Sequence, residues 1–176
     1  TAVSVWSFQR LIGRKELDHF TVLQKIKDYG FDAVEYIDLY VPEGKTEEEY
    51  AREIRAEADR LGLEISAYSL SCDLLNGSGG DLEKELERLY RKIDVAEILG
   101  AKILRHDAFW KLGDIRSWRE AVDAIAPAIY EVAEYAESKG IVTCSENHGM
   151  IMQDSERMEY MINRVNHKNY GWLVDM

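Results

Sequence analysis

The chain has 176 residues, 46% of them hydrophobic, and a formal net charge of −11 from 33 acidic and 22 basic residues. This hydrophobic content is enough for a sizeable core and excludes a disordered chain. The acidic balance argues against a surface built to bind nucleic-acid phosphates. No apolar run approaches the roughly 20 residues that cross a bilayer, and no charged segment followed by an apolar one begins the chain. We therefore expect a cytoplasmic protein with no membrane or nucleic-acid partner.

Short apolar or β-branched runs alternate with longer segments of helical periodicity along the whole chain. A capping-box pattern at Thr46 to Glu49 begins one of these helices, and four helices end at a glycine immediately before the next run. We expect a loop at 9–14. The predicted strands are 3–8, 33–37, 64–70, 102–106, 141–145 and 170–175, and the predicted helices are 16–29, 46–61, 81–99, 117–138 and 155–165.

This alternation predicts α/β class, with parallel strands and right-handed crossovers. A doubly wound sheet would favour a glycine-rich phosphate turn after an early strand, and residues 9–14 hold a single glycine. We therefore expect a parallel (β/α) barrel of the TIM type, forming a single domain over 1–176. A complete barrel has eight units in about 250 residues, so we expect about six of the eight units and a truncation at the C-terminal side. Because an open sheet exposes its edges, we also expect a homo-oligomer, a dimer or tetramer.

The two cysteines, Cys72 and Cys144, lie in strand-like runs and lack C-x-x-C spacing. This placement is typical of reduced, packed thiols rather than of a disulfide or a metal site.

Polar side chains follow the predicted strands at the point where each strand ends. In a parallel barrel these strand ends meet at one mouth, where active groups lie. Carboxylates and imidazoles gathered there are potential ligands for a divalent cation. The candidates are Arg105, His106 and Asp107 after the fourth strand, Glu146, Asn147 and His148 after the fifth, Asp175 after the sixth, and Glu35 within the second.

Each candidate also has a structural interpretation. Glu35 can form an interior ion pair with Arg105, and His106 can be a core histidine bonded to a backbone carbonyl. His148 can lie in a loop near the site without binding metal, and Asp175 can cap a strand end. The residue pattern leaves these alternatives open, as it does for the tryptophans, which can serve core or lid packing.

Four motifs in sequence order resemble those of a known family. The resemblance is to the xylose isomerase-like barrels, which include sugar phosphate isomerases/epimerases, inosose dehydratases, hydroxypyruvate isomerases and apurinic endonucleases, and it covers nearly the whole chain. The motifs are Tyr-Gly-Phe-Asp-Ala-Val-Glu at 29–35, Ala-Glu-Ile-Leu-Gly-Ala-Lys at 96–102, Ser-Glu-Asn-His-Gly at 145–149 and Gly-Trp-Leu-Val-Asp-Met at 171–176.

The resemblance implies one divalent metal, Mn, Mg, Co or Zn, held by Glu, Asp, His and Glu from the fifth to eighth strands. Glu146 matches the first ligand and Asp175 the second, and the other two fall outside this sequence, so the fragment can lack the metal. Glu146 would also move a proton through an enediolate, as ligand and general base or acid.

Further roles follow from the same resemblance. His148 and His106 would hydrogen-bond substrate hydroxyls, Glu35 and Arg105 would order the metal ligands, and Trp6 is counted with the substrate-binding residues.

The function that the resemblance implies is an isomerase or epimerase acting on a small carbohydrate, either a sugar or a sugar phosphate. Two alternatives remain, an inosose-type dehydratase and a barrel that binds a sugar without turning it over. The endonuclease branch is disfavoured. It uses several histidines around three zinc ions, whereas the third strand here ends in residues 69–71, Ser-Leu-Ser, and the net charge opposes a DNA groove.

Overall fold

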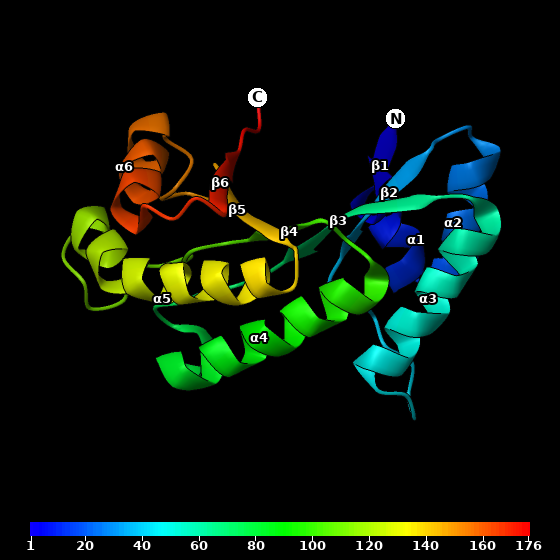
Figure 1. Cartoon of the computed structure of the whole chain (residues 1–176), viewed down its shortest axis with the longest axis horizontal. Helices are drawn as coiled ribbons and strands as arrows, with labels where there is room; N and C mark the ends of the chain where they lie inside the picture. Colours follow the sequence, from blue (N-terminus) through cyan, green and yellow to red (C-terminus); the bar gives the residue numbers. More distant parts are fainter. The chain divides into compact units, whose positions relative to one another are not determined.

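The computed structural model describes all residues from 1 to 176 and contains six strands that alternate with helices (Figure 1). The chain divides into two compact units. The first consists of Thr1–Ser69 and Val95–Lys102, and the second of Leu70–Asp94 and Ile103–Met176.

The first unit contains a three-stranded parallel ladder in chain order. Ser4 at the end of one strand is in register with Glu35 of the next, and a bulge at Val34 and Glu35 shifts the following pairing. Val22, Leu23 and Ile54 are fully buried, as expected for helices that cover a sheet. The elements are β1 (Ala2–Ser4), η1 (Val5–Phe8), α1 (Gln9–Gly13), α2 (His19–Asp28), β2 (Ala33–Ile37), α3 (Glu47–Leu61) and β3 (Glu64–Leu70).

The predicted first strand, 3–8, is wrong beyond Ser4, and the predicted loop at 9–14 is mostly helix α1. The Ser4 hydroxyl accepts a hydrogen bond from the Trp6 amide and caps the 3-10 turn η1. The alternating apolar and polar residues of this run imitate a strand, but a capping serine offers its backbone a local alternative to ladder pairing.

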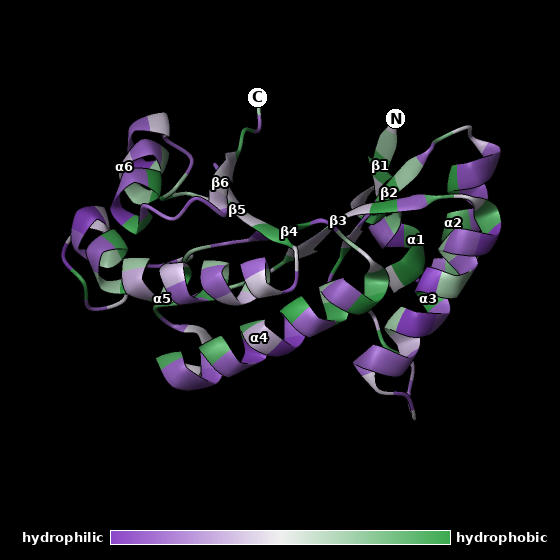
Figure 2. Ribbon diagram, in the orientation of Figure 1, coloured by the Kyte–Doolittle hydropathy of each residue, from purple (hydrophilic) through white to green (hydrophobic).

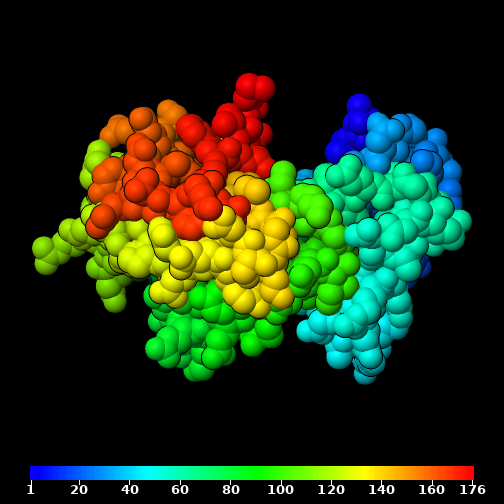
Figure 3. Space-filling view, viewed as in Figure 1, coloured from blue at the N-terminus to red at the C-terminus, as the bar shows by residue number.

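The second unit contains the other parallel ladder, in which Arg105 is in register with Cys144, and Glu146 with Leu173. Leu104 and Met158 are among its fully buried side chains. In the space-filling view the orange and red residues of α6 and β6 lie against the yellow residues of α5 (Figure 3). The elements are η2 (Gly77–Gly79), α4 (Leu82–Leu99), β4 (Ile103–His106), α5 (Trp118–Ser138), β5 (Val142–Glu146), α6 (Ser155–Val165) and β6 (Tyr170–Leu173), of which the end of α4 from Val95 onward is counted in the first unit.

The helix boundaries follow the predicted signals closely. Both hydrogen bonds of the capping box between Thr46 and Glu49 are present, and the Ser117 hydroxyl caps α5. The four predicted terminal glycines all have positive φ, a conformation that glycine adopts without strain. Figure 2 shows hydrophilic and hydrophobic residues alternating around α4 and α5, as expected for helices that bury one face.

Two further sequence predictions concern the cysteines and the last strand. Cys72 and Cys144 are free and buried, as predicted. The sixth strand ends at Leu173 rather than at Asp175, so Asp175 lies just beyond it. None of the helices combines the length and the apolar character needed to cross a membrane.

Candidate active site

Arg105, near the end of β4, joins carboxylates that follow two adjacent strands. Its Nη2 atom lies 2.8 Å from Asp107 Oδ1 and 2.6 Å from Glu146 Oε2. Its Nη1 atom donates to the Leu70 carbonyl at 3.4 Å. Because Arg105 and Asp107 are buried, this ion pair is shielded from water and holds the Glu146 side chain in one direction.

The sequence places Asp107 among the strand-end candidates, after β4, but gives it no specific role in the site. Its Oδ1 atom lies 3.6 Å from Nδ1 of His148, in the loop after β5. Burial raises the pKa of Asp107, and the neighbouring Arg105 and His148 oppose that rise. Its position directly after a strand that ends in Arg-His was the available signal in the sequence.

His106 is fully buried and its ring stacks on Tyr170, with 5.9 Å between ring centroids. Its Nδ1 atom lies 2.9 Å from the Asp107 carbonyl. Because a carbonyl only accepts hydrogen bonds, Nδ1 carries the hydrogen. Burial lowers the pKa of His106 to about 4, so the imidazole is neutral at pH 7. His106 is thus a core histidine bonded to a backbone carbonyl, one of the two alternatives that the sequence left open. Contact of His106 with a substrate stays a prediction.

Three successive residues after the apolar part of β4 each keep one buried polar atom without a hydrogen-bond partner. These atoms are Arg105 Nε, His106 Nε2 and Asp107 Oδ2. Each such atom costs about 1–3 kcal/mol of folding stability. A concentration of unsatisfied polar atoms in one short segment is typical of a functional site rather than of a segment optimised for packing.

Asn147 connects the ends of β5 and β6. Its side-chain amide donates to the Asp175 carbonyl at 2.7 Å, and its Oδ1 atom accepts from the Asp175 amide at 2.8 Å and from Trp172 Nε1 at 2.9 Å. Glu146 and Asp175 are therefore held at adjacent strand ends, where the sequence places them. Glu146 keeps 21% of its side-chain surface exposed, and Asp175 is exposed.

His148 stands at the edge of this group, with 47% of its side chain exposed. The ring of Trp110 meets it in an edge-to-face arrangement, with 5.2 Å between centroids. His148 therefore contacts a carboxylate on one side and an aromatic ring on another.

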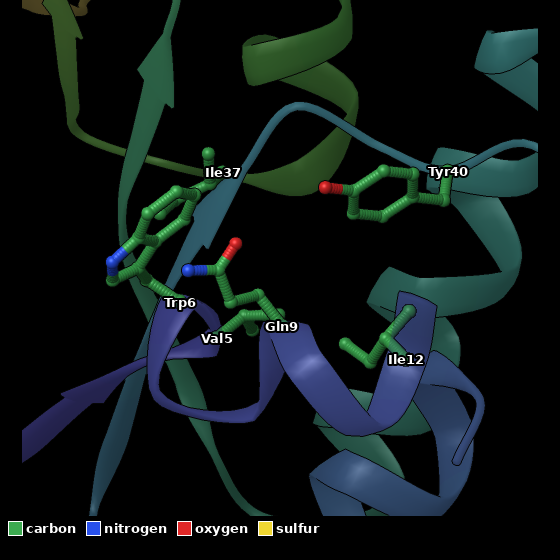
Figure 4. A pocket seen from close by; sticks show the side chains of 6 residues that line it. All are labelled: Val5, Trp6, Gln9, Ile12, Ile37 and Tyr40. Carbon is green, nitrogen blue, oxygen red and sulfur yellow. The ribbon is translucent and has the colours of Figure 1, made fainter. Parts of the chain in front are cut away.

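Two predicted site residues belong to the first unit. The Glu35 carboxylate accepts a hydrogen bond from the Ser69 hydroxyl. Trp6 lines a shallow pocket near the ends of β1 and β2, and the amide of Gln9 lies between the rings of Trp6 and Tyr40 (Figure 4). Both Trp6 and Tyr40 are more than half exposed.

A family model described as "Xylose isomerase-like TIM barrel" matches residues 23–176. The chain belongs to this family. The xylose isomerase-like barrel was the resemblance seen in the sequence motifs, and the expected fold class is confirmed. No curated protein matches the chain.

Solved xylose isomerase-like structures share the fold at low sequence identity. The probable 3-DHS dehydratase AsbF from Bacillus anthracis is 19% identical, with a TM-score of 0.74, over 99% of this chain and 62% of that one. D-psicose 3-epimerase from Clostridium cellulolyticum H10, with D-tagatose, is 16% identical, with a TM-score of 0.74, over 90% and 58%. A Mycobacterium smegmatis protein in complex with magnesium is 22% identical, with a TM-score of 0.67, over 90% and 57%. The chain thus spans about three fifths of these structures.

The donors present in this xylose isomerase-like chain suit a divalent cation only in part. Glu146 and Asp175 offer carboxylate oxygens, the donor type that Mg and Mn prefer. The chain holds no group of three or more His, Cys, Asp or Glu side chains that could bind a metal ion. Glu146 and Asp175 therefore fit as part of a ligand set and do not form a complete one.

Proposed function

We propose that this chain forms part of a metal-dependent isomerase or epimerase that acts on a small sugar or sugar phosphate. The observation that supports this most directly is the Asn147 bridge, which holds Glu146 and Asp175 at neighbouring strand ends. The Arg105 ion pair adds a fixed orientation for the Glu146 carboxylate. A carboxylate held in a fixed orientation is what proton transfer to and from a substrate carbon requires.

In this proposal Glu146 and Asp175 supply two of the ligands of one divalent metal. A bound metal would polarise the substrate carbonyl and hydroxyl and so acidify the adjacent C–H bond. The Glu146 carboxylate takes that proton, and an enediolate of the substrate forms. Returning the proton to the other carbon gives the isomer, and returning it to the other face gives the epimer. Arg105 keeps Glu146 directed during both transfers.

Dehydration is the second candidate, because the site holds another acid–base pair. A dehydratase needs the same proton removal, followed by loss of a β-hydroxyl as water, and the departing oxygen needs a proton donor. His148, whose Nδ1 lies 3.6 Å from Asp107, follows Glu146 by two residues in the chain and suits this role.

Hydrogen exchange at the substrate carbon tests the step that all three reactions share. The whole protein to which this chain belongs would be incubated in D₂O with Mn²⁺ or Mg²⁺ and a panel of ketoses and their phosphates, and deuterium uptake would be followed by NMR. We expect exchange with the wild type and a loss of about 10²-fold or more in Glu146→Gln, the usual scale of general-base catalysis. Glu159→Gln, an exposed glutamate of α6, is the matched control and should exchange normally.

The products separate the candidates. Isomers or epimers without loss of water support the first candidate, and an unsaturated product supports dehydration. Saturable binding of a sugar without deuterium uptake would favour the barrel that binds a sugar without turnover. Exchange that continues unchanged in Glu146→Gln would refute the assignment of Glu146 as the base.

A further inference from the structure

The loop between β3 and α4 is organised around one carboxylate, Asp73. Its Oδ1 atom accepts hydrogen bonds from the amides of Leu75 at 3.0 Å and Asn76 at 2.9 Å. A side chain that bonds the amides two and three residues ahead forms an Asx turn, which fixes the local backbone. One oxygen of Asp73 is thus fully used within its own loop.

The other oxygen of Asp73 reaches the loop between β4 and α5. Asp73 Oδ2 accepts from the Trp110 amide at 3.3 Å and also from Asn76 Nδ2, in its own loop, at 3.2 Å. Two further bonds join the same loops, from Asn76 Nδ2 to the Lys111 carbonyl at 2.9 Å and from the Leu74 amide to the Ala108 carbonyl at 2.9 Å. The loops also approach closely, since a β-carbon added at Gly113 would lie 2.8 Å from Asn76 Oδ1.

The β4–α5 loop, held in this way by Asp73, contacts His148 through Trp110. The Trp110 ring meets the imidazole edge to face, and a β-carbon added at Gly149 would lie 3.3 Å from the same ring. Burial does not fix either side chain, because Trp110 is 39% and His148 is 47% exposed. The ring of Trp110 is therefore directed by its backbone, and the Trp110 amide is held by Asp73.

We propose that Asp73 is a positioning residue that acts through Trp110 to fix the orientation of His148 toward Asp107. The influence of Asp73 on His148 passes through the backbone of the β4–α5 loop, where Asp73 bonds the Trp110 amide. The effect on catalysis rests on the proposed function, whereas the effect on the His148 ring does not.

The substitution Asp73→Asn removes the acceptor of the Trp110 amide and keeps an oxygen for the bonds to Leu75 and Asn76. An asparagine keeps one oxygen for the Asx turn but places an NH₂ group opposite the Trp110 amide, and two donors cannot bond. Asp81→Asn, in the same loop, is the matched control. Asp81 caps α4 by accepting from the Lys84 amide, and asparagine caps a helix equally well. If Asp73→Asn does not fold, Asp73→Ser keeps the turn with one oxygen and lacks the second.

Proton NMR of the imidazole reads the orientation of His148 directly. The chain has four histidines, and the His148 signals are assigned by their loss in His148→Gln. The adjacent Trp110 ring shifts these signals, so Trp110→Ala sets the value expected when the contact is lost. We expect Asp73→Asn to move the His148 signals most of the way to that value, and Asp81→Asn to leave them unchanged.

Kinetics then test the consequence. With the substrate found by exchange, we expect kcat of Asp73→Asn to fall by about 10- to 100-fold, the scale of a small misplacement of a reacting group, with KM changed less than threefold. His148 signals that stay at their wild-type positions in Asp73→Asn would overturn the proposal. Altered signals with no exchange activity in any form of the protein would leave the positioning role standing and reject the proposed function.

Discussion

His19 provides a test of the electrostatics of the first unit that needs no substrate. It begins α2, is 2% exposed, and neither ring nitrogen has a hydrogen-bond partner. Its ring packs among Tyr36, Tyr40 and Tyr50, at centroid distances of 5.4, 6.1 and 5.8 Å. Burial lowers the pKa of His19 to about 4, and the adjacent Asp18 opposes this only weakly.

The sign of the pH effect follows from proton binding. Between pH 4 and 6.5 the unfolded chain binds a proton at His19 and the folded chain does not, so stability falls as the pH drops through this window and is complete above it. With pKa values of about 4 and 6.5 in the folded and unfolded states, the loss at pH 5.0 is about 2 kcal/mol. That is a large part of the stability of an ordinary domain.

The substitution His19→Phe removes the titrating group and keeps an aromatic ring. We expect the variant to equal or exceed the wild type at pH 7.5, because two buried nitrogens without partners become carbon. At pH 5.0 its advantage should grow by about 2 kcal/mol. Urea unfolding, followed by tryptophan fluorescence at both pH values, measures the difference in free energy of unfolding between the variant and the wild type. Because all other titrating groups are present in both proteins, their contributions cancel in this difference.

Tyr36→Phe is the matched control for this experiment. It removes another buried polar atom without a partner from the same cluster, and burial raises the pKa of Tyr36 further above this pH range. Its effect on stability should therefore be the same at pH 7.5 and 5.0. If His19→Phe shows an equally flat response, the assignment of a lowered pKa to His19 is wrong.

Three further predictions concern stability and are measured by urea unfolding at pH 7.5. Thr46→Ala removes the capping box of α3 and should lower the free energy of unfolding by about 1 kcal/mol; no change would mean that the helix end is already frayed. Leu104→Ala leaves a cavity in a fully buried part of β4 and should lower it by about 2–5 kcal/mol, unless the core collapses around the smaller side chain. Arg105→Met leaves two carboxylates without their partner and should lower it by about 3–5 kcal/mol; a neutral result would show that water reaches both.

The positions of the elements could be predicted because their signals are local. The capping box at Thr46 and the terminal glycines determine helix ends through bonds within a few residues. The same reasoning failed at Val5–Phe8, where a strand-like alternation forms a 3-10 turn because the Ser4 hydroxyl bonds the Trp6 amide. Alternation describes which faces are apolar and cannot detect a competing local bond.

The strand-end positions of the candidate residues could be predicted from the sequence, but their pairing could not. Strand-end positions identified Glu146, Asp175 and Arg105 because parallel strands share one edge. The partner considered for Arg105 was Glu35, whereas the structure pairs Arg105 with Asp107 and Glu146, and Glu35 with Ser69. Which carboxylate a guanidinium reaches depends on register and side-chain direction, and neither is contained in a residue pattern.

The end of β4 is less favourable for folding stability than its apolar part. Leu104 is fully buried in an apolar core, whereas Arg105 and His106, with Asp107 after them, leave polar atoms without partners. Removing one member of a buried ion pair is costly, yet replacing the whole group by apolar residues of similar volume is often neutral or stabilising. We therefore expect the triple variant Arg105→Met, Asp107→Leu, Glu146→Leu to unfold at a higher urea concentration than Arg105→Met alone, and close to the wild type. If the triple variant is as unstable as the single one, Arg105, Asp107 and Glu146 are present for stability, and the functional interpretation of this strand end loses its physical basis.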